Sequence, residues 1–335
     1  MGEFTSDIIK SEHGGGGDMM ETMIKSLYIN GFSLNKIQGG LGLPDMDDSG
    51  TIPFGDGHIV FTTDSHTVTP LFFPGGDIGR LSISGTINDL SVMGAKPLAL
   101  SSGVILPEGF STDQFRKIIK SMDETLKEAD VPLITGDTKV AGNDLFINTS
   151  GVGYTHNLLS DKDLKEGDLI IVSGTIGDHG ASMLSVREDI PFLSSIKSDV
   201  APLNKMIERI LPYKIRSMKD PTRGGIANSL NEFSKKSGVR IEIKEEKIPV
   251  REEVASICDI LGLNFMEIAC EGKVLISVER EDAETVLDLI RKDRRGKNAA
   301  IIGEVKKGEK VILETVIGGR RILEPPVSDP VPRVC

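Results

Sequence analysis

Acidic residues beside glycine or hydroxyl residues are the first candidates for chemistry in this sequence. They stand in the segments DDSG, TTDS, TINDL, TGDTK and KDPTRGG, at positions that we expect to be strand ends and loop tips: Asp47, Asp48, Asp64, Asp89, Asp137 and Asp220. If the strands are neighbours, these carboxylates project into one crevice. Mg²⁺ prefers oxygen ligands and usually bridges a few carboxylates to substrate phosphates. A single loop aspartate is usually a turn former or helix cap, but several together favour a metal–phosphate site.

Three glycine-rich segments precede predicted helices, namely HGGGGD (13–18), GTIGDHG (174–180) and PTRGG (221–225). Exposed backbone N–H groups at a helix N-terminus attract anions, so each segment is a candidate phosphate contact. Gly15 and Gly16 are the candidates in the first. None is a Walker A loop, because no GK[ST] follows. The alternatives are a flexible terminus for the first segment and tight turns for the other two.

Lys139 in GDTK and Glu271 in CEGK are candidates for a phosphate contact or a base. The alternative interpretation is that Lys139 is an ordinary surface lysine and Glu271 a solvated turn residue. The five histidines have no paired metal-ligand spacing. We interpret His58, His66 and His156 as strand or turn residues without a chemical role. The roles of His13 and His179, which stand beside glycines, are left open.

The three cysteines fall into two classes. An odd, sparse count without CxxC spacing argues against a disulfide framework and a structural zinc site, and fits a reducing compartment. Cys258 and Cys270 are expected to be buried apolar residues. Cys335 is the last residue, on a segment with four prolines in thirteen residues (323–335). Such an arm is extended and stiff, and from Pro325 it could reach roughly 30 Å, so this thiol is expected to act as a carrier, the alternative being an unselected terminal residue.

Elements that could position these residues alternate along the whole chain. Hydrophobic periodicity predicts a helix from Asp18, a long loop over 35–57 and, in the first half, strands at 58–65, 97–106 and 145–155 and helices at 77–95 and 111–129, the last capped by Ser111. The second half adds strands at 169–174, 240–244, 273–279, 299–305 and 310–315, and helices within 178–187, at 202–211, after Gly225 and at 281–292. Residues 11–17 are expected to lack regular structure. The sequence therefore predicts an α/β (α+β) protein.

A polar break near 156–167 divides the chain. We predict an N-terminal ATP-binding and dimerisation domain at 1–160, a C-terminal α/β domain at 161–322 and a proline-rich tail at 323–335. The 335 residues are enough for two domains of ordinary size.

The charge balance excludes some classes of protein. Lys and Arg number 39 and Asp and Glu number 50, so the net charge is −11. This argues against nucleic-acid binding, and an anionic substrate would need a metal or backbone N–H groups. The sequence has neither a signal peptide nor an apolar run of about 20 residues that would cross a membrane. A cytoplasmic location without membrane partners is therefore expected.

Seven segments together resemble the HypE family of hydrogenase maturation factors, in the superfamily of aminoimidazole ribonucleotide synthetase and selenophosphate synthetase. They are TTDS, TINDLSVMGAKPLALS, GDTK, SGTIGDHGASML, DPTRGGIA, ACEGK and the terminal PRVC. The resemblance runs from Gly14 to Cys335. The NDLxxMGAxP and DPTRGG patterns identify the superfamily, and PRVC is the part specific to HypE.

The resemblance implies a two-domain PurM-like fold whose N-terminal domain forms a β-barrel across a homodimer, with ATP between the domains. It also implies a reaction: a partner carbamoyltransferase, HypF, loads a carbamoyl group onto Cys335, and ATP-dependent dehydration then yields a thiocyanate. The cyanide passes to iron on a HypC–HypD scaffold for the [NiFe] hydrogenase centre.

By motif, the resemblance implies that four aspartates bind Mg²⁺ and phosphate: Asp48, Asp64, Asp89 and Asp220. Asp137, Thr138 and Lys139 match the segment near the transferred phosphate, and Lys139 and Glu271 are candidates for base and orienter. Two departures stand out. Ser49 and Gly50 replace the two alanines that relatives often have, and His66 stands where relatives often have an aromatic residue.

Two other functions stay open at this point. The first is another enzyme of the superfamily, of the selenophosphate or amidine synthetase type; the first 257 residues contain no cysteine, which disfavours the selenophosphate version. The second is a non-catalytic scaffold whose proline-rich tail docks partners.

Overall fold

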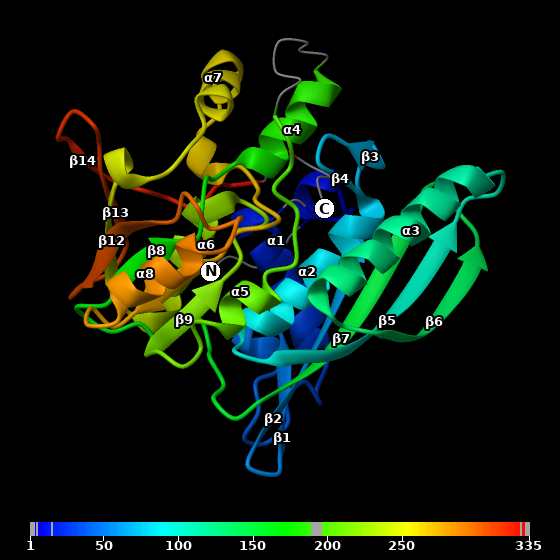
Figure 1. Ribbon diagram of the computed structural model, residues 1–335, viewed down its shortest axis with the longest axis horizontal. Coiled ribbons are helices and arrows are strands. Elements are labelled where there is room, and N and C mark those ends of the chain that lie inside the picture. Colours follow the sequence, from blue (N-terminus) through cyan, green and yellow to red (C-terminus); the bar gives the residue numbers. More distant parts are fainter. Residues whose placement is uncertain (1–3, 5, 15, 189–195, 329, 332–335) are drawn as a thin grey trace.

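The computed structural model describes residues 4, 6–14, 16–188, 196–328 and 330–331. In these residues it contains two large β-sheets side by side (Figure 1) and a two-stranded sheet of β3 (Phe72–Phe73) and β4 (Gly76–Asp77). The N-terminal sheet has five strands in the order β1-β2-β7-β5-β6. Their bounds are β1 Gly50–Phe54, β2 Gly57–His66, β7 Phe146–Thr155, β5 Lys96–Leu106 and β6 Leu133–Val140. All neighbouring pairs are antiparallel except β5 and β6. In the part of the chain that is described, β1 and β6 are free edges, so the sheet does not close into a barrel within one chain.

Two helices cover one face of this sheet, α2 (Ile78–Val92) and α3 (Thr112–Ala129). Helix α2 lies between the two sheets (Figure 1) and is buried along most of its length. Asn88 joins it to the C-terminal half, because its side chain donates to Ala201 O (3.1 Å) and accepts from Leu203 N (2.8 Å). Ser111 caps α3 by accepting from Gln114 N at 3.4 Å, which confirms the predicted cap.

The C-terminal sheet has seven strands in the order β14-β13-β10-β12-β8-β11-β9. Their bounds are β8 Leu169–Val172, β9 Ile215–Lys219, β10 Arg240–Lys244, β11 Leu275–Val278, β12 Ala300–Lys306, β13 Val311–Glu314 and β14 Arg320–Ile322. The helices of this half are α4 Asp178–Arg187, α5 Asn204–Glu208, α6 Gly225–Ser237, α7 Glu252–Leu261 and α8 Ala283–Arg291. β11 is buried throughout, as expected for a central strand covered on both faces.

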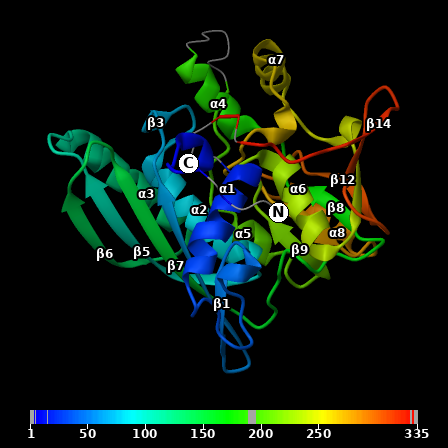
Figure 2. The ribbon, with the colours of Figure 1, turned by 180° about the vertical axis from the view of Figure 1, so that it is seen from behind.

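The N-terminal segment crosses from one half to the other. Helix α1 (Gly17–Met23) continues as a π-helical turn (Ile24–Tyr28) and a 3₁₀ turn (Ile29–Gly31). Seen from behind, α1 lies beside α6 (Figure 2), and Glu21 forms an ion pair with Lys235 at 2.9 Å. Gly17 has a φ of +70°, and an added Cβ would lie 2.3 Å from Pro326 O, so only glycine lets the helix approach the C-terminal segment here.

Several expectations about local structure were wrong. Residues 11–17 do contain regular structure, a 3₁₀ turn at Ser11–Gly14 and the start of α1. The loop expected over 35–57 contains β1, whose Pro53 is tolerated because β1 is an edge strand. β6 was not foreseen, because it is exposed along its whole length and contains Gly136 and Asp137, so no hydrophobic alternation marks it. β9, β14 and α7 were also not anticipated.

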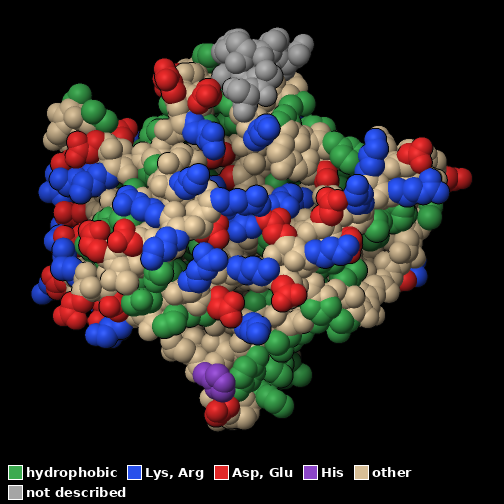
Figure 3. Space-filling view, in the orientation of Figure 1, with side chains coloured by type: hydrophobic (Ala, Val, Ile, Leu, Met, Phe, Trp, Pro, Cys, Tyr) green, Lys and Arg blue, Asp and Glu red, His purple; other side chains and the backbone are tan. Residues whose placement is uncertain are grey.

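The second face of the N-terminal sheet exposes large apolar side chains. Along β2, Val60 and Thr62 are buried toward α2, whereas Phe61 between them is 50% exposed. The same face and its edges expose Ile52, Phe54, Leu98, Ile105, Ile134 and Phe146. Figure 3 shows hydrophobic side chains gathered at the lower end of the molecule, over the β1–β2 hairpin. Among the described residues, no helix is both long and apolar enough to cross a membrane.

The described cysteines and histidines lie mostly in the interior. Cys258 and Cys270 are buried and unpaired, as predicted. His13 and His179 are also buried, and His179 Nδ1 lies 2.8 Å from Ser198 Oγ. Burial beside a hydroxyl group accounts for His179 structurally.

Candidate functional site

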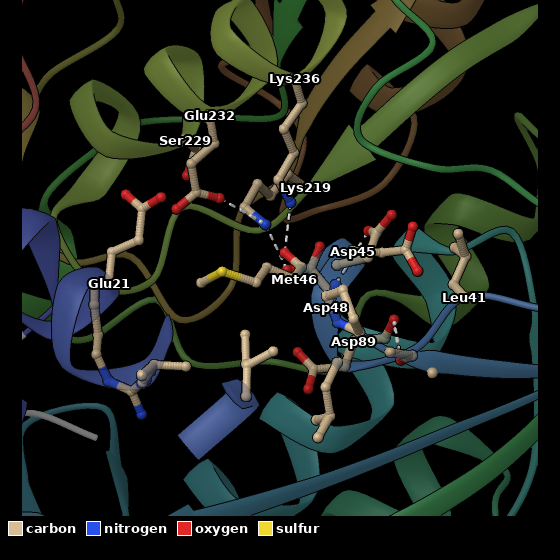
Figure 4. A pocket seen from close by; sticks show the side chains of 18 of the residues that line it. Glu21, Leu41, Asp45, Met46, Asp48, Asp89, Lys219, Ser229, Glu232 and Lys236 are labelled. Carbon is tan, nitrogen blue, oxygen red and sulfur yellow. Dashed lines mark hydrogen bonds and ion pairs between the residues drawn. The ribbon is translucent and has the colours of Figure 1, made fainter. Parts of the chain in front are cut away.

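A cleft of about 1730 Å³ runs between the two halves of the molecule (Figure 4). Its walls come from α1 and the turns after it, the loop before β1, strand β2, helix α2 and one side of helix α6 along most of its length. Six of the predicted acidic residues line it: Asp47, Asp48, Asp64, Asp89, Asp220 and Glu271. Residues spread over more than 220 positions of the sequence are therefore brought together at one place, as the motif pattern predicted.

The acids reach the cleft from regular elements as well as from loops. Asp48 lies in the loop before β1 and Asp220 in the loop after β9, which agrees with the expected loop positions although neither strand was predicted, but Asp64 lies within β2 and Asp89 within α2. The expectation of strand ends and loop tips was wrong for these two and for Asp137, which lies within β6. Strand alternation explains Asp64, because residues 62, 64 and 66 share the face of β2 turned toward α2.

A glycine of α2 lets the helix approach that face. A Cβ at Gly85 would lie 3.0 Å from His66 Nε2 and 3.2 Å from Asp64 Oδ2. His66 Nε2 itself lies 3.0 Å from Asp64 Oδ2, and the ring is almost fully buried. His66 therefore belongs to the site, contrary to the expectation that it has no chemical role.

One end of the cleft, which we call the acid end, consists of Asp64, Asp89, Asp220 and Glu271. Burial, together with the neighbouring charges of Asp220 and Asp64, raises the pKa of Asp89 well above its usual value, although Thr62 donates to it at 3.0 Å. Burial and the charges of Asp220, Asp199 and Asp64 likewise raise the pKa of Glu271 well above its usual value. Glu271 Oε1 has no hydrogen-bond partner among the described residues.

Asp64 is the exception at the acid end. Burial by itself would raise the pKa of its carboxyl group, but His66 and Arg223 outweigh burial and hold that pKa well below the usual range. Burial raises the pKa of Asp220, while the Thr222 hydroxyl, which donates to Asp220 Oδ2 at 2.6 Å, opposes the rise. The acid end thus contains one firmly ionised carboxylate among others that resist ionisation.

A second group of charges, which we call the lysine end, consists of Asp48, Lys219, Glu232 and Lys236, which line the cleft, and of Asp161, which is buried behind the two lysines. Lys219 Nζ lies 2.6 Å from Asp48 Oδ1 and 3.0 Å from Glu232 (Figure 4). Burial would lower the pKa of Lys219, but these carboxylates raise it well above its usual value, so the ammonium stays charged. Burial raises the pKa of Asp48 to about 8, with Lys219 opposing and Asp220 and Asp47 reinforcing the rise.

The donor set fits a divalent cation only in part. Carboxylate oxygens are the ligands that Mg²⁺ prefers, and Asp48 Oδ2 and Glu271 Oε1 are buried without partners among the described residues. Crowded carboxylates whose pKa values are raised gain from a bound cation. In the described part of the chain, however, no three acidic, histidine or cysteine side chains are close enough to form a metal site by themselves. The arrangement fits a cation that shares its ligands with a phosphate.

The other predicted site residues lie elsewhere. Gly16 lines the cleft, whereas Gly15 and Cys335 lie outside the described residues. Asp137, Thr138 and Lys139 are on the edge strand β6, from which no described residue reaches the cleft. The side chain of Lys139 is 69% exposed, and its Nζ lies 3.1 Å from Asp137 Oδ2.

Sequence reasoning missed Asp161, Glu232 and Lys236, which stand in none of the motifs, and also missed three residues that stand in or beside the motifs: His66, Lys219 and Arg223. Signals for the last three were present. Lys219 and Arg223 flank Asp220 in the KDPTRGG segment, where cations beside a carboxylate would pair with it or with phosphate. His66 follows Asp64 by two residues, the spacing that places both on one face of a strand.

Both halves of the chain match known protein families. Residues 46–155 match the N-terminal domain of AIR synthase related proteins, and residues 165–316 match the C-terminal domain of the same proteins. The fold is therefore that of the AIR synthase related proteins, a PurM-like α/β fold with two domains.

Individual relatives show to which branch of this family the chain is similar. The chain is 54% identical, over 96% of its length and 98% of the relative, to a Methanocaldococcus jannaschii protein named for hydrogenase expression and formation. It is 40% identical to the carbamoyl dehydratase HypE of Azotobacter vinelandii, covering 98% of this chain and 97% of that one.

Two solved structures of HypE proteins are also similar to this chain. One, of a HypE–HypF complex, superposes with a TM-score of 0.85 at 45% identity, covering 91% of this chain and 99% of that one. A HypE structure in complex with ATP gives a TM-score of 0.80 at 38% identity, covering 96% and 98%. The chain belongs to the HypE carbamoyl dehydratases within the AIR synthase related family.

Proposed function

We propose that this protein is an ATP-dependent carbamoyl dehydratase of hydrogenase maturation, acting on a carbamoyl group carried by its own Cys335. The observation that carries the proposal is the meeting of buried carboxylates, an interdomain cleft and the C-terminal tail. ATP is the nucleotide bound in the HypE structure that superposes on this chain. The product is a thiocyanate whose cyanide becomes a ligand of the hydrogenase iron.

The path of the tail supports a self-contained reaction. Leu323 is buried against the C-terminal core, and its backbone oxygen accepts from Asn231 at 2.8 Å. Pro325 lines the cleft, and Pro326 passes directly beneath Gly17. Val331, four residues before the end, is buried in the same apolar cluster as Ala181 and Ile268. The described part of the tail thus touches the cleft at Glu324 and Pro325 and is anchored again at Val331, and a tether held beside the cleft would make the reaction intramolecular.

The reaction needs an activated oxygen and the removal of two protons. The S-carboxamide oxygen attacks the γ-phosphorus of ATP, the bond from that phosphorus to the β-γ bridging oxygen breaks, and ADP leaves. The phosphorylated oxygen is a good leaving group. Loss of both N–H protons with phosphate departure then gives S–C≡N. Mg²⁺ would neutralise the phosphate charge.

Specific residues of the cleft match these needs. Asp48, Asp64, Asp89 and Asp220 would hold the Mg²⁺ and orient the phosphates, and the nearby Gly16 would contact the nucleotide. Glu271 Oε1, buried and unpaired in the described structure, is the candidate acceptor for an amide proton. Arg223, whose charge lowers the pKa of Asp64 and opposes the rise in the pKa of Glu271, would face the developing negative charge.

Lys139, Asp137 and Thr138 enter the proposal through a homodimer. The exposed apolar face that includes Phe61 and Ile105 needs a cover, and a second copy would supply one and complete a barrel. Pairing there would bring the β6 strand of one subunit near the cleft of the other, where Lys139 would be the alternative base. Analytical ultracentrifugation of Phe61→Glu tests this dimer.

The proposed partners follow from the reaction. A carbamoyl donor enzyme must reach Cys335, and HypF is the protein bound to HypE in the complex that superposes on this chain with a TM-score of 0.85. An iron-carrying HypC–HypD scaffold would receive the cyanide.

Mass spectrometry of the C-terminal peptide tests the proposal. The protein is incubated with HypF, carbamoyl phosphate and ATP, and dehydration is expected to remove about 18 Da from carbamoylated Cys335. Cys335→Ala is expected to take up no carbamoyl group while still binding ATP. A tail that stays carbamoylated while ATP is hydrolysed would contradict the proposal.

A further inference from the structure

The segment between the two domains contains a buried acidic residue, Asp161, whose side chain is 1% exposed. A buried carboxylate is costly unless cations pair with it. Two lysines of the C-terminal half do so: Lys236 Nζ lies 2.6 Å from Asp161 Oδ2, and Lys219 Nζ lies 3.5 Å from the same oxygen. Asp161 is therefore the counter-charge shared by β9 and α6.

Both lysines continue to the loop that carries Asp48. Lys219 donates to Asp48 Oδ1 at 2.6 Å, and Lys236 donates to the backbone oxygen of Met46. The linker holds the same loop directly, because Asp47 Oδ2 accepts from Ser160 Oγ at 2.7 Å and from the Asp161 N–H at 3.3 Å. Loop 46–48 is thus joined to the linker and to the C-terminal half at every one of its three residues.

We propose that Asp161 is a positioning residue of the nucleotide site, which acts through Lys219 and Lys236 to hold loop 46–48 so that Asp48 faces the cleft before any ligand binds. The inference rests on the proposed function for the identity of the ligand, ATP. Asp161 does not line the cleft, so its effect on the ligand is indirect.

The geometry explains why a charge is needed there. Lys219 bonds Asp48 and Glu232 in addition to Asp161. Without Asp161, Lys236 would lose the one carboxylate that pairs with it in the described structure, and it would be free to leave Met46. Lys219 bonds only Oδ1 of Asp48, and Oδ2 has no hydrogen-bond partner among the described residues, so Lys219 is the contact that holds this carboxyl group in place. A displacement of Asp48 would weaken nucleotide binding without touching the ligand.

The experiment compares four forms of the full-length protein: wild type, Asp161→Asn, Lys236→Met and the double variant. Isothermal titration with ATP and Mg²⁺ is expected to show about tenfold weaker binding for each single variant. The double variant should bind no more weakly than either single one, because both changes break the same connection. Asp163→Asn is the matched control, an exposed acid two residues along the same linker, and it should bind ATP as the wild type does.

Hydrogen exchange gives a second readout that does not need a nucleotide. The amides of residues 43–51 should exchange faster in Asp161→Asn and Lys236→Met, while those of β5 and β7 keep wild-type rates. If wild type binds no ATP, the proposed function fails, and the exchange of the loop still decides the positioning role. Variants with a lower melting temperature but wild-type affinity and wild-type loop exchange would show a merely structural role and overturn the inference.

Discussion

The acid end and the lysine end differ in how their buried carboxyl groups are compensated. At the lysine end, ammonium groups of the protein lie against the carboxylates and oppose the rise in pKa that burial causes, and Lys219 alone contacts three of them. At the acid end, cations of the chain hold only Asp64 firmly ionised. Asp89, Asp220 and Glu271 keep raised pKa values because they are buried and repel one another.

Because of this difference, we expect the two ends to have different functions. Charges that the protein pairs internally fix geometry but have little capacity left for a ligand. Carboxylates left crowded and unpaired attract a cation or a proton, and so they suit phosphate neutralisation and proton transfer. We therefore expect changes at the acid end to affect rate, and changes at the lysine end to affect stability and nucleotide affinity.

Glu271→Gln should have the largest effect. The amide cannot accept a proton, so the dehydration rate should fall by about 10²- to 10⁴-fold, while ATP affinity stays within about threefold of wild type. Single-turnover kinetics on the carbamoylated protein measure the rate, and titration measures the affinity. Glu246→Gln, on an exposed turn, is the control. Wild-type dehydration by Glu271→Gln would place the base elsewhere, with Lys139 as the next candidate.

Lys219→Met should cost about 3–5 kcal/mol of unfolding free energy, because it leaves Asp48 and Asp161 buried with less compensating charge. Urea unfolding measures the loss. Lys235→Met is the control, since its pair with Glu21 is 59% exposed on the lysine side and should contribute at most about 1 kcal/mol. Equal losses for the two variants would remove the distinction between the two ends.

The pH dependence of stability should report on Asp48. With a pKa of about 8, the folded protein keeps this proton near neutral pH, whereas the unfolded chain has released it above about pH 4. The folded state binds more protons, so the free energy of unfolding should fall as pH rises from about 4 to about 8. Asp48→Asn should reduce the fall between pH 6 and pH 8 by at most about 1.4 kcal/mol per unit.

Asp45 provides the control for this measurement. Burial would raise the pKa of its carboxyl group, but Lys36 and the Gly42 N–H outweigh burial and lower it. Its contribution to stability is therefore present above about pH 4 and is lost only in more acidic solution. Asp45→Asn should leave the slope between pH 6 and pH 8 unchanged, and an equal slope in wild type and Asp48→Asn would contradict the prediction.

The smallest effect is expected where this chain departs from its relatives. Ser49 Oγ makes one long hydrogen bond, 3.3 Å to Asp89 O, and a Cβ at Gly50 would find its nearest atoms at 3.7 and 3.8 Å. The double variant Ser49→Ala/Gly50→Ala should change the unfolding free energy by about 0.5 kcal/mol or less and leave ATP affinity unchanged. A marked loss of affinity would show that the loop beside Asp48 tolerates less than its geometry indicates.

Local sequence signals predicted the main helices and buried strands, because their apolar residues recur with the period of the element. The same reasoning failed for β6 and β1, edge strands that contain glycine or proline and bury little. It placed Asp48 and Asp220 correctly in loops, because both stand in segments rich in loop-forming residues. It expected Asp64 and Asp89 at strand ends or loop tips, although both lie inside elements that the periodicity itself predicted, the strand at 58–65 and the helix at 77–95.

The sequence by itself determined the types and order of the acidic motifs, the absence of a disulfide framework, the resemblance to HypE and the presence of a terminal cysteine on a proline-rich segment. These depend on composition and short-range spacing alone. Only the tertiary structure decided which charges meet. Lys219, 171 residues from Asp48, becomes its counter-ion, and Asp161 becomes buried between two lysines. Electrostatic interaction depends on distance and burial, and neither follows from the linear order of the residues.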